Sequence, residues 1–306
     1  MLRSILVAAV CVIASQVGSV TGLQTLSGKL FQFTANNTHL TAFYSGPRHA
    51  DQAVVLLPGL QEGPLSLPWT NRLGKRLAKK NWALVQPTLS SSYLGFGTGT
   101  LQRDTGELDL LVEALVRQGK RRIVMIGHST GSQQTLHYAR FGSQRKYLAG
   151  GVLQAALSDR EYYVSSMPDH AHWVQMATQM RAQGQGQEMM PRRAFSFAAV
   201  TADRFFSLCA RGGDDDMFSS DLTPTELAAI YKPVSVPLAM VLSGSDEYMP
   251  KNVSAESLLA NQKAAYSGFT LMKVVPGADH IVSGAPQIKQ LLSIIFEFID
   301  KLDKKA

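Results

Sequence analysis

A serine stands at the centre of the segment Gly127-His128-Ser129-Thr130-Gly131. Its hydroxyl could act as a nucleophile, because the pattern G-x-S-x-G is typical of a tight, strained turn that joins a strand to a helix. The apolar run Ile123 to Ile126 immediately precedes it and predicts that strand. In such a turn the glycines allow close approach of backbone, and the first helical amides point toward developing negative charge. The alternative is a glycine-rich turn without chemistry.

A nucleophilic serine needs a general base, and the histidines after Ser129 are His137, His170, His172 and His280. In chains that use this turn, the acid follows the nucleophile and the histidine comes last. His137 falls in the helix behind the serine, and the next two fall in a segment without predicted strands. We therefore expect His280, which follows the last predicted strand, to be the base, although a lone loop histidine is more often a surface residue.

The acid that orients the imidazole and stabilises its protonated form is expected after the predicted strand Leu238 to Leu242. Two adjacent carboxylates follow that strand, Asp246 and Glu247. Asp246 comes first, directly beyond a glycine-containing turn, and is the predicted acid, with Glu247 as the alternative. Asp279 is a weaker candidate because it adjoins His280 in sequence. Each carboxylate could instead cap a local turn.

Hydrolysis at a serine also needs two backbone N–H groups that stabilise the oxyanion. One is expected from Thr130, the residue after the nucleophile. The other is expected from the loop that follows the apolar run Ala53 to Leu57, where Gly59 allows a tight turn and Leu60 is the predicted donor. The alternative for this loop is an ordinary turn at the end of a strand.

Predicted strands and helices alternate along the chain, which favours a mostly parallel, doubly wound α/β sheet. Their expected ranges are 29–34, 40–44, 53–57, 83–85, 123–126, 151–154, 238–242 and 271–275 for strands, and 69–80, 104–118, from 130 onward and 288–302 for helices. The interval from about 158 to 236 contains no clean strand. We expect it to form a helical cap over the carboxyl ends of the strands, where ligands bind in such sheets. Its many methionines could alternatively be core filler.

Charged residues in the predicted cap are candidates for contacts with substrate or for anchoring the cap. Asp159 and Arg160 begin the insertion, and Asp215 lies in the run Gly212 to Asp216. A metal site is not expected there, because consecutive acids point in different directions and no histidine accompanies them. Ion pairs that anchor the loop are the preferred interpretation, with a role toward substrate as the alternative.

The composition, with 45% hydrophobic and 17% charged residues, is that of a globular protein. The net charge of +7 is spread over several predicted helices without a nucleic-acid motif, so we expect no nucleic-acid partner. Two cysteines, Cys11 and Cys209, exclude a disulfide scaffold. We expect no cofactor and no metal, and the sequence does not indicate an oligomeric state.

Residues 1–22 have the pattern of a secretory signal peptide. Arg3 is followed by an apolar run, Ile5 to Ala14, and then by small and polar residues. The run is too short to span a bilayer, so no stable membrane span is expected. Two glycosylation sequons begin at Asn36 and Asn252. We therefore expect a protein of the secretory pathway, with an apolar tail on a cytoplasmic protein as the alternative.

Several longer motifs resemble the fungal siderophore esterases of the fusarinine type, a little-characterised branch of the α/β-hydrolase superfamily. They are GHSTGSQ, LQRD within GFGTGTLQRD, GGVLQAALSDREYY, RFFSLCARGGDDDMFSSDLT and LSGSDEYMP. The resemblance extends from about Leu30 to near the C-terminus. It implies an α/β-hydrolase fold for residues 23–306, a triad of Ser129, Asp246 and His280, and, for some members, hydrolysis of esters in hydroxamate siderophores. Members of the family are generally intracellular, unlike a chain with a signal peptide.

The sequence thus predicts a serine hydrolase that acts on a small-molecule carboxylic ester. A lipase or thioesterase would use the same triad and differ in its leaving group and pocket. A binding protein or receptor with the same fold could retain the triad without catalysis. Slow turnover with tight ligand binding would distinguish that alternative.

Overall fold

The computed structural model describes residues 24–195 and 197–303, so the expected signal peptide at 1–22 lies outside the described residues. Eight strands form one sheet in the order β1-β2-β4-β3-β5-β6-β7-β8. The strands are β1 Lys29–Gln32, β2 Thr41–Ser45, β3 Gln52–Leu57, β4 Trp82–Thr88, β5 Arg122–His128, β6 Leu148–Gln154, β7 Leu238–Ser243 and β8 Phe269–Val275. β1 and β2 form an antiparallel hairpin at one edge, β2 is antiparallel to β4, and the other neighbours are parallel. This confirms the predicted doubly wound sheet.

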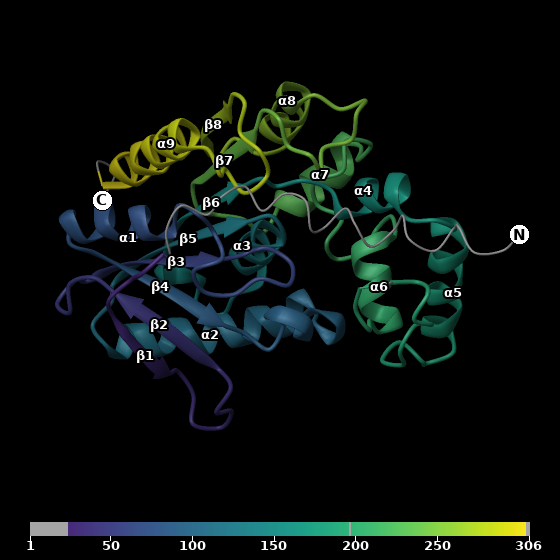
Figure 1. Cartoon of the computed structure of the whole chain (residues 1–306), viewed down its shortest axis with the longest axis horizontal. Coiled ribbons are helices and arrows are strands. Elements are labelled where there is room, and N and C mark those ends of the chain that lie inside the picture. Colours follow the sequence, from purple (N-terminus) through teal and green to yellow (C-terminus); the bar gives the residue numbers. More distant parts are fainter. Residues whose placement is uncertain (1–23, 196, 304–306) are drawn as a thin grey trace, which may run out of the picture.

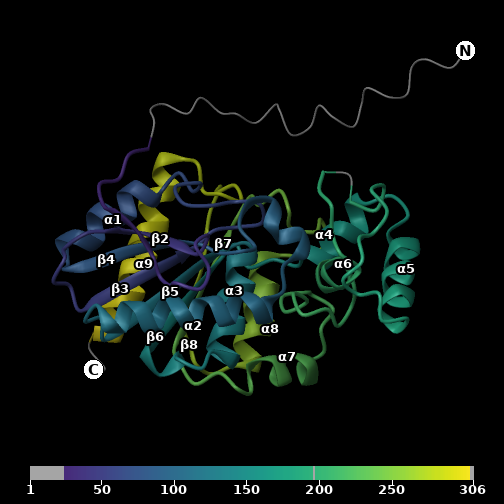
Figure 2. The same cartoon turned by 90° about the horizontal axis from the view of Figure 1, so that it is seen from below.

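Helices cover both faces of the sheet (Figures 1 and 2). The helices are α1 Thr70–Lys79, α2 Leu101–Arg117, α3 Thr130–Phe141, α4 Asp159–Ser166, α5 His170–Ala182, α6 Ala202–Cys209, α7 Pro224–Tyr231, α8 Ala255–Ala265 and α9 Ala285–Asp303, with short 3-10 turns at Tyr93–Thr98 (η1) and Arg145–Tyr147 (η2). No helix in the described part of the chain is long and apolar enough to cross a membrane.

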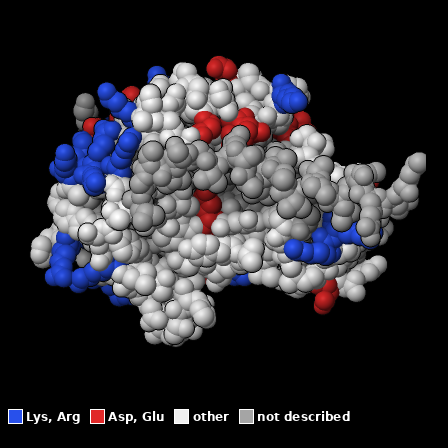
Figure 3. Space-filling view, viewed as in Figure 1, with Lys and Arg blue, Asp and Glu red and all other residues white. Residues whose placement is uncertain are grey.

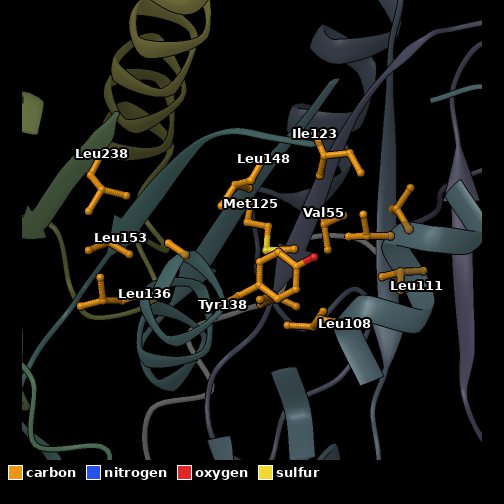
Figure 4. Close-up of a cluster of buried hydrophobic side chains, with 14 of the residues drawn as sticks. Val55, Leu108, Leu111, Ile123, Met125, Leu136, Tyr138, Leu148, Leu153 and Leu238 are labelled. Atoms are coloured by element: carbon orange, nitrogen blue, oxygen red, sulfur yellow. The ribbon is translucent and has the colours of Figure 1, made fainter. Parts of the chain in front are cut away.

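The central strands are apolar on both sides because each side packs against helices. Along β3, Val55 and Leu57 join the core formed with α2, α3 and α8, whereas Val54 and Leu56 join the core formed with α1 and α9. Successive side chains of a strand point to opposite faces, so an unbroken apolar run fills both layers. Figure 4 shows the first of these cores, in which Val55, Met125, Leu136 and Tyr138 pack together.

Helices α4, α5, α6 and α7 all lie between β6 and β7, in the interval where no clean strand was expected. An isolated bridge joins Met189 to Thr201 there. α4, α5 and α6 gather at one end of the molecule in both views, with α5 outermost (Figures 1 and 2). They share a third core with η1, which includes Phe96, Tyr163, Phe195 and Phe205. We call residues 158–236 the cap.

The basic residues of α1 lie at the end of the molecule opposite the cap. Figure 3 shows Lys and Arg side chains gathered at that end of one face. Arg72, Lys75 and Lys79 are on this helix, Lys80 follows it directly, and its buried residues include Leu73 and Leu77. The helix is therefore amphipathic, with a solvated basic face.

Candidate active site

Ser129 occupies the sharp turn between β5 and α3. Its backbone has φ 53° and ψ −125°, a conformation that L-residues rarely adopt. The turn requires its two glycines, because a Cβ on Gly127 would lie 2.0 Å from the carbonyl oxygen of Gly131, and a Cβ on Gly131 would lie 2.2 Å from that of Leu57. Ser129 is partly exposed at this turn, although the strand before it is buried. The motif thus presents its hydroxyl at the carboxyl edge of the sheet.

His280 and Asp246 meet at the ends of the neighbouring strands β8 and β7. Nδ1 of His280 lies 2.9 Å from both carboxylate oxygens of Asp246, whose side chain is fully buried. Glu247 contacts a different atom, since its Oε2 accepts the backbone N–H of His280 at 2.9 Å. The structure therefore brings together the predicted base and the predicted acid, and gives Glu247 a separate role in holding the backbone of the histidine loop.

The environment of His280 favours its protonated form. Burial acts to lower the pKa of the imidazole, but the hydrogen bond and charge of Asp246, together with the charges of Glu247 and Glu62, outweigh it and raise the pKa above its ordinary value. An imidazole whose protonated form is stabilised in this way can accept a proton from a neighbouring hydroxyl. The arrangement therefore suits a general base.

His128, the residue before the serine, was not among the predicted site residues. Its ring is buried and packs against that of His280, with the ring centroids 4.8 Å apart. Burial and the charge of His280 lower its pKa to about 3, so it is neutral, and its Nδ1 lies 2.5 Å from Oε1 of Gln154 at the end of β6. His128 thus forms a neutral packing surface for the base. Its place inside the G-x-S-x-G motif was the only sequence signal for this role.

The loop after β3 lies directly against the nucleophile. A Cβ built on Gly59 would be 3.1 Å from Cβ of Ser129, so only glycine allows this approach without displacement. Leu60, the predicted oxyanion donor, follows Gly59 and packs against the core of the cap. Thr130, the other predicted donor, is buried at the first position of α3. The structure therefore places both donor residues on the two segments that flank Ser129.

Glu62 holds the same loop and was missed by the sequence analysis. Its Oε2 accepts the backbone N–H of Gly59 at 2.7 Å. Burial raises the pKa of this carboxyl, whereas the Gly59 hydrogen bond and the charge of His280 act to lower it. A glutamate three residues after a turn glycine is an ordinary loop feature, so no sequence signal identified it.

The three cap candidates have different surroundings. Arg160 is buried and pairs with Asp216, with its Nε 3.1 Å from Oδ1, and also with Asp221. Asp215 is buried and pairs with Arg204 at 2.6 Å. Arg160 and Asp215 therefore belong to ion pairs within the cap, as expected if such pairs anchor the loop. Asp159 is partly exposed, and its Oδ2 accepts a hydrogen bond from Nε2 of Gln133 at 2.7 Å.

Tyr248 forms a further wall of the site and was not predicted. It is 40% exposed, and its ring stacks edge-on against His280, with centroids 4.6 Å apart, and against Tyr162 of α4, at 5.0 Å. An aromatic bridge therefore connects the histidine loop to the cap. Among the described residues, no group of three or more His, Cys, Asp or Glu side chains is arranged to hold a metal ion.

Comparison with solved structures gives the class of the protein. The siderophore hydrolase EstB of Aspergillus fumigatus superposes with a TM-score of 0.73 at 24% identity, covering 91% of this chain and 98% of EstB. The fold is that of the α/β-hydrolases, as predicted.

Residues 21–300 match the family model described as "Protein of unknown function (DUF1749)", and the chain belongs to this family. It is 31% identical over 281 residues to the UPF0613 protein PB24D3.06c of Schizosaccharomyces pombe, covering 81% of this chain and 88% of the relative. It is 25% identical over 297 residues to the fusarinine C esterase sidJ of Aspergillus fumigatus, covering 77% and 84%. The predicted resemblance to siderophore esterases is confirmed, and the chain is an esterase enzyme.

Proposed function

We propose that the protein hydrolyses a small-molecule carboxylic ester through a triad of Ser129, His280 and Asp246. The observation that carries this proposal is the strained turn that exposes Ser129 directly after His128, whose ring packs against His280, the histidine bonded to a buried aspartate. His280 takes the proton of the Ser129 hydroxyl as it attacks the ester carbonyl, and later returns it to the leaving alcohol. The backbone amides of Leu60 and Thr130 stabilise the oxyanion. Water then releases the acyl group by the same steps.

The proposed substrate is a medium-sized ester that carries amide or hydroxamate groups, as in a siderophore. A polar side chain of the cap supports this choice, because Asp159 lies at the junction with α3, where it accepts a hydrogen bond from Gln133. A purely lipidic substrate would leave such groups unpaired at about 1–3 kcal/mol each. The relatives named as esterases of fusarinine C and of siderophores lend further support.

Labelling with a fluorophosphonate tests the nucleophile. We expect the wild-type protein to be labelled, and the variant Ser129→Ala to lose both labelling and activity, with kcat reduced by roughly 10⁴ to 10⁶. Ser293→Ala, a change of the same kind on the exposed face of α9, is the matched control and should be labelled normally. Labelling that persists in a folded Ser129→Ala protein would overturn the proposed nucleophile.

A panel of esters tests the substrate class. We expect kcat/KM to be higher for a hydroxamate-containing ester than for a long-chain triglyceride. A tenfold preference for the triglyceride, equivalent to about 1.4 kcal/mol of transition-state binding, would identify a lipase instead. Tight ligand binding with no turnover of any ester would favour the receptor alternative.

We also propose that the protein enters the secretory pathway, on the basis of Arg3 and the apolar run that follows it. Both sequon asparagines, Asn36 and Asn252, are exposed, as glycosylation requires. N-terminal sequencing of the protein from its native cells should give a start near Leu23. An intact Met1 on an unglycosylated protein would contradict this proposal.

A further inference from the structure

Asp159 is a carboxylate without a cationic partner at the junction of the cap and the sheet. It is the first residue of α4, and its carboxylate accepts a hydrogen bond from the side-chain amide of Gln133, on α3 four residues beyond Ser129. Within residues 24–195 and 197–303, no Lys, Arg or His side chain lies within 4 Å of its carboxylate oxygens. Burial, followed by the charge of Asp215, raises the pKa of Asp159 to about 7.

Neighbouring carboxylates of the cap are paired, which makes Asp159 different from them. Asp215 is bonded to Arg204, and Asp216 to Arg160. A partly buried carboxylate with one neutral hydrogen-bond donor is unfavourable, because its charge and remaining lone pairs have lost part of their water. Asp159 is therefore suited to a partner that comes from outside the chain.

A second observation indicates a ligand at the same place. Gln133 is 1% exposed, and its Oε1 accepts no hydrogen bond from the described residues, although its Nε2 donates to Asp159. The two atoms belong to one amide, so the orphaned carbonyl oxygen lies beside the Asp159 carboxylate. Buried polar atoms in native proteins are almost always paired. The charged carboxylate of Asp159 and the neutral side-chain carbonyl of Gln133 are thus neighbouring acceptors that can each bind a further hydrogen-bond donor.

Asp159 and Gln133 lie on segments next to the proposed active site. Gln133 is one turn along α3 from Ser129, and Asp159 begins the segment that follows β6, the strand beside the nucleophile strand. The charge of His280 also reaches Asp159. Glu62 and Glu247 add negative charge around His280, and Arg204, a buried cation whose charge also reaches Asp159, is already bonded to Asp215.

We infer that Asp159 and the side-chain carbonyl of Gln133 bind an ammonium or another cationic, hydrogen-bond-donating group carried by the ester substrate. An ammonium group has three donors and a positive charge, so it can satisfy the carboxylate and the orphaned carbonyl together. An apolar group would leave both unpaired, and a carboxylate would be repelled. This inference deepens the proposed esterase function and rests on it for the location of the reacting ester.

The first test compares three esters of similar length with the wild-type protein. They are the p-nitrophenyl esters of 6-aminohexanoic acid, heptanoic acid and adipic acid, whose chains end in an ammonium, a methyl and a carboxylate group. The butyrate esters of 6-amino-1-hexanol and 1-heptanol place the same difference on the alcohol side. We expect kcat/KM to be at least about tenfold higher for the ammonium ester of one of these series than for its neutral analogue, and lowest for the carboxylate.

The second test assigns the preference to Asp159. In Asp159→Asn, which retains the shape of the side chain, the ratio of kcat/KM for the ammonium ester to that for the neutral ester should fall by about tenfold. Asp214→Asn is the matched control, because Asp214 is an exposed carboxylate of the cap, and it should leave the ratio unchanged. An equal ratio in wild type and Asp159→Asn overturns the inference.

A binding measurement separates this inference from the esterase proposal. Calorimetry with the Ser129→Ala protein should give a lower Kd for ethyl 6-aminohexanoate than for ethyl heptanoate, and the difference should disappear in Ser129→Ala/Asp159→Asn. If wild type hydrolyses no ester but this difference is found, the esterase proposal fails and the cation site stands. If esters are hydrolysed through Ser129 without any preference for the ammonium group in turnover or binding, the cation site fails and the esterase stands.

Discussion

Asp246 and His280 are bonded through both carboxylate oxygens, each 2.9 Å from Nδ1 of the imidazole. The two residues come from the ends of adjacent parallel strands, β7 and β8, whose register aligns Ser243 with Val275. The loops beyond these strands therefore start side by side. This explains why residues 34 positions apart meet.

Substitution of the two adjacent acids should separate their roles. Asp246→Asn should lower kcat by about 10⁴, because an amide at this position favours the wrong tautomer of His280. Glu247→Gln should have a much smaller effect, since its oxygen binds the backbone N–H of His280 and a glutamine carbonyl can do the same. Steady-state kinetics on one ester would decide, and a larger loss in Glu247→Gln would mean that Glu247 is the acid.

Glu62→Gln should shift the pH dependence of kcat/KM toward lower pH. The acid limb reports protonation of the base in the free enzyme. Asp246, Glu247 and Glu62 surround His280 with negative charge, while the buried His128 is neutral. Removing the charge of Glu62 lowers the pKa of His280, so the base stays unprotonated at a lower pH, and a glutamine oxygen can still accept the N–H of Gly59.

The matched control for this shift is Glu188→Gln, which changes an exposed glutamate of the cap. Its pH profile should coincide with that of the wild type. If the acid limb of the kcat/KM profile is unchanged or moves to higher pH in Glu62→Gln, the negative charge of Glu62 does not raise the pKa of His280.

Two glycine-to-alanine substitutions should change stability in opposite directions. Gly131→Ala places a Cβ 2.2 Å from the carbonyl oxygen of Leu57 and should lower the free energy of unfolding by about 1–3 kcal/mol through overpacking. Gly106 lies inside α2, and a Cβ there meets nothing within 4 Å. Gly106→Ala should therefore raise the free energy of unfolding by about 0.5–1 kcal/mol. Urea denaturation measures both, and equal effects would contradict the packing argument.

The buried ion pair of the cap should be sensitive to removal of one partner. Arg204 and Asp215 are both almost fully buried. Asp215→Asn leaves an unpaired buried guanidinium and should lower the free energy of unfolding by about 3–5 kcal/mol, whereas Arg204→Met/Asp215→Asn should recover part of that loss. Arg211→Met is the control, because its partners Asp221 and Glu226 are exposed and the loss should be about 0–1 kcal/mol. No recovery in the double variant would contradict a charge effect.

The central elements could be predicted because their apolar runs and order directly determine a parallel sheet. Boundaries were harder to predict. β4 was expected to end at Val85 but continues to Thr88, and beyond Val85 it pairs with β2 but no longer with β3. α2 begins three residues earlier than expected, because Thr100 caps it. α8 was not predicted, since its periodic pattern is weak.

The candidate site could be predicted where chain order selects a residue, as for Ser129 and His280. Glu62 could not be predicted, because its charge effect on His280 depends on the conformation of the loop after β3. The sequence also did not show that Arg204 pairs with Asp215 rather than with Asp159, because this pairing depends on the packing of α6. The sequence supplied the acidic residues of the cap but not their partners.

The insertion of the cap between two adjacent strands has a consequence for the divergence of relatives. β6 and β7 pair directly in the sheet, so the chain leaves and re-enters at neighbouring points. Most of the third apolar core and the buried pair of Arg204 and Asp215 belong to the cap, whereas Ser129, Asp246 and His280 lie outside it. A different segment of any length could therefore connect the same two points. Exchange of residues 158–236 between relatives is a direct route to new ester specificities on unchanged catalytic machinery.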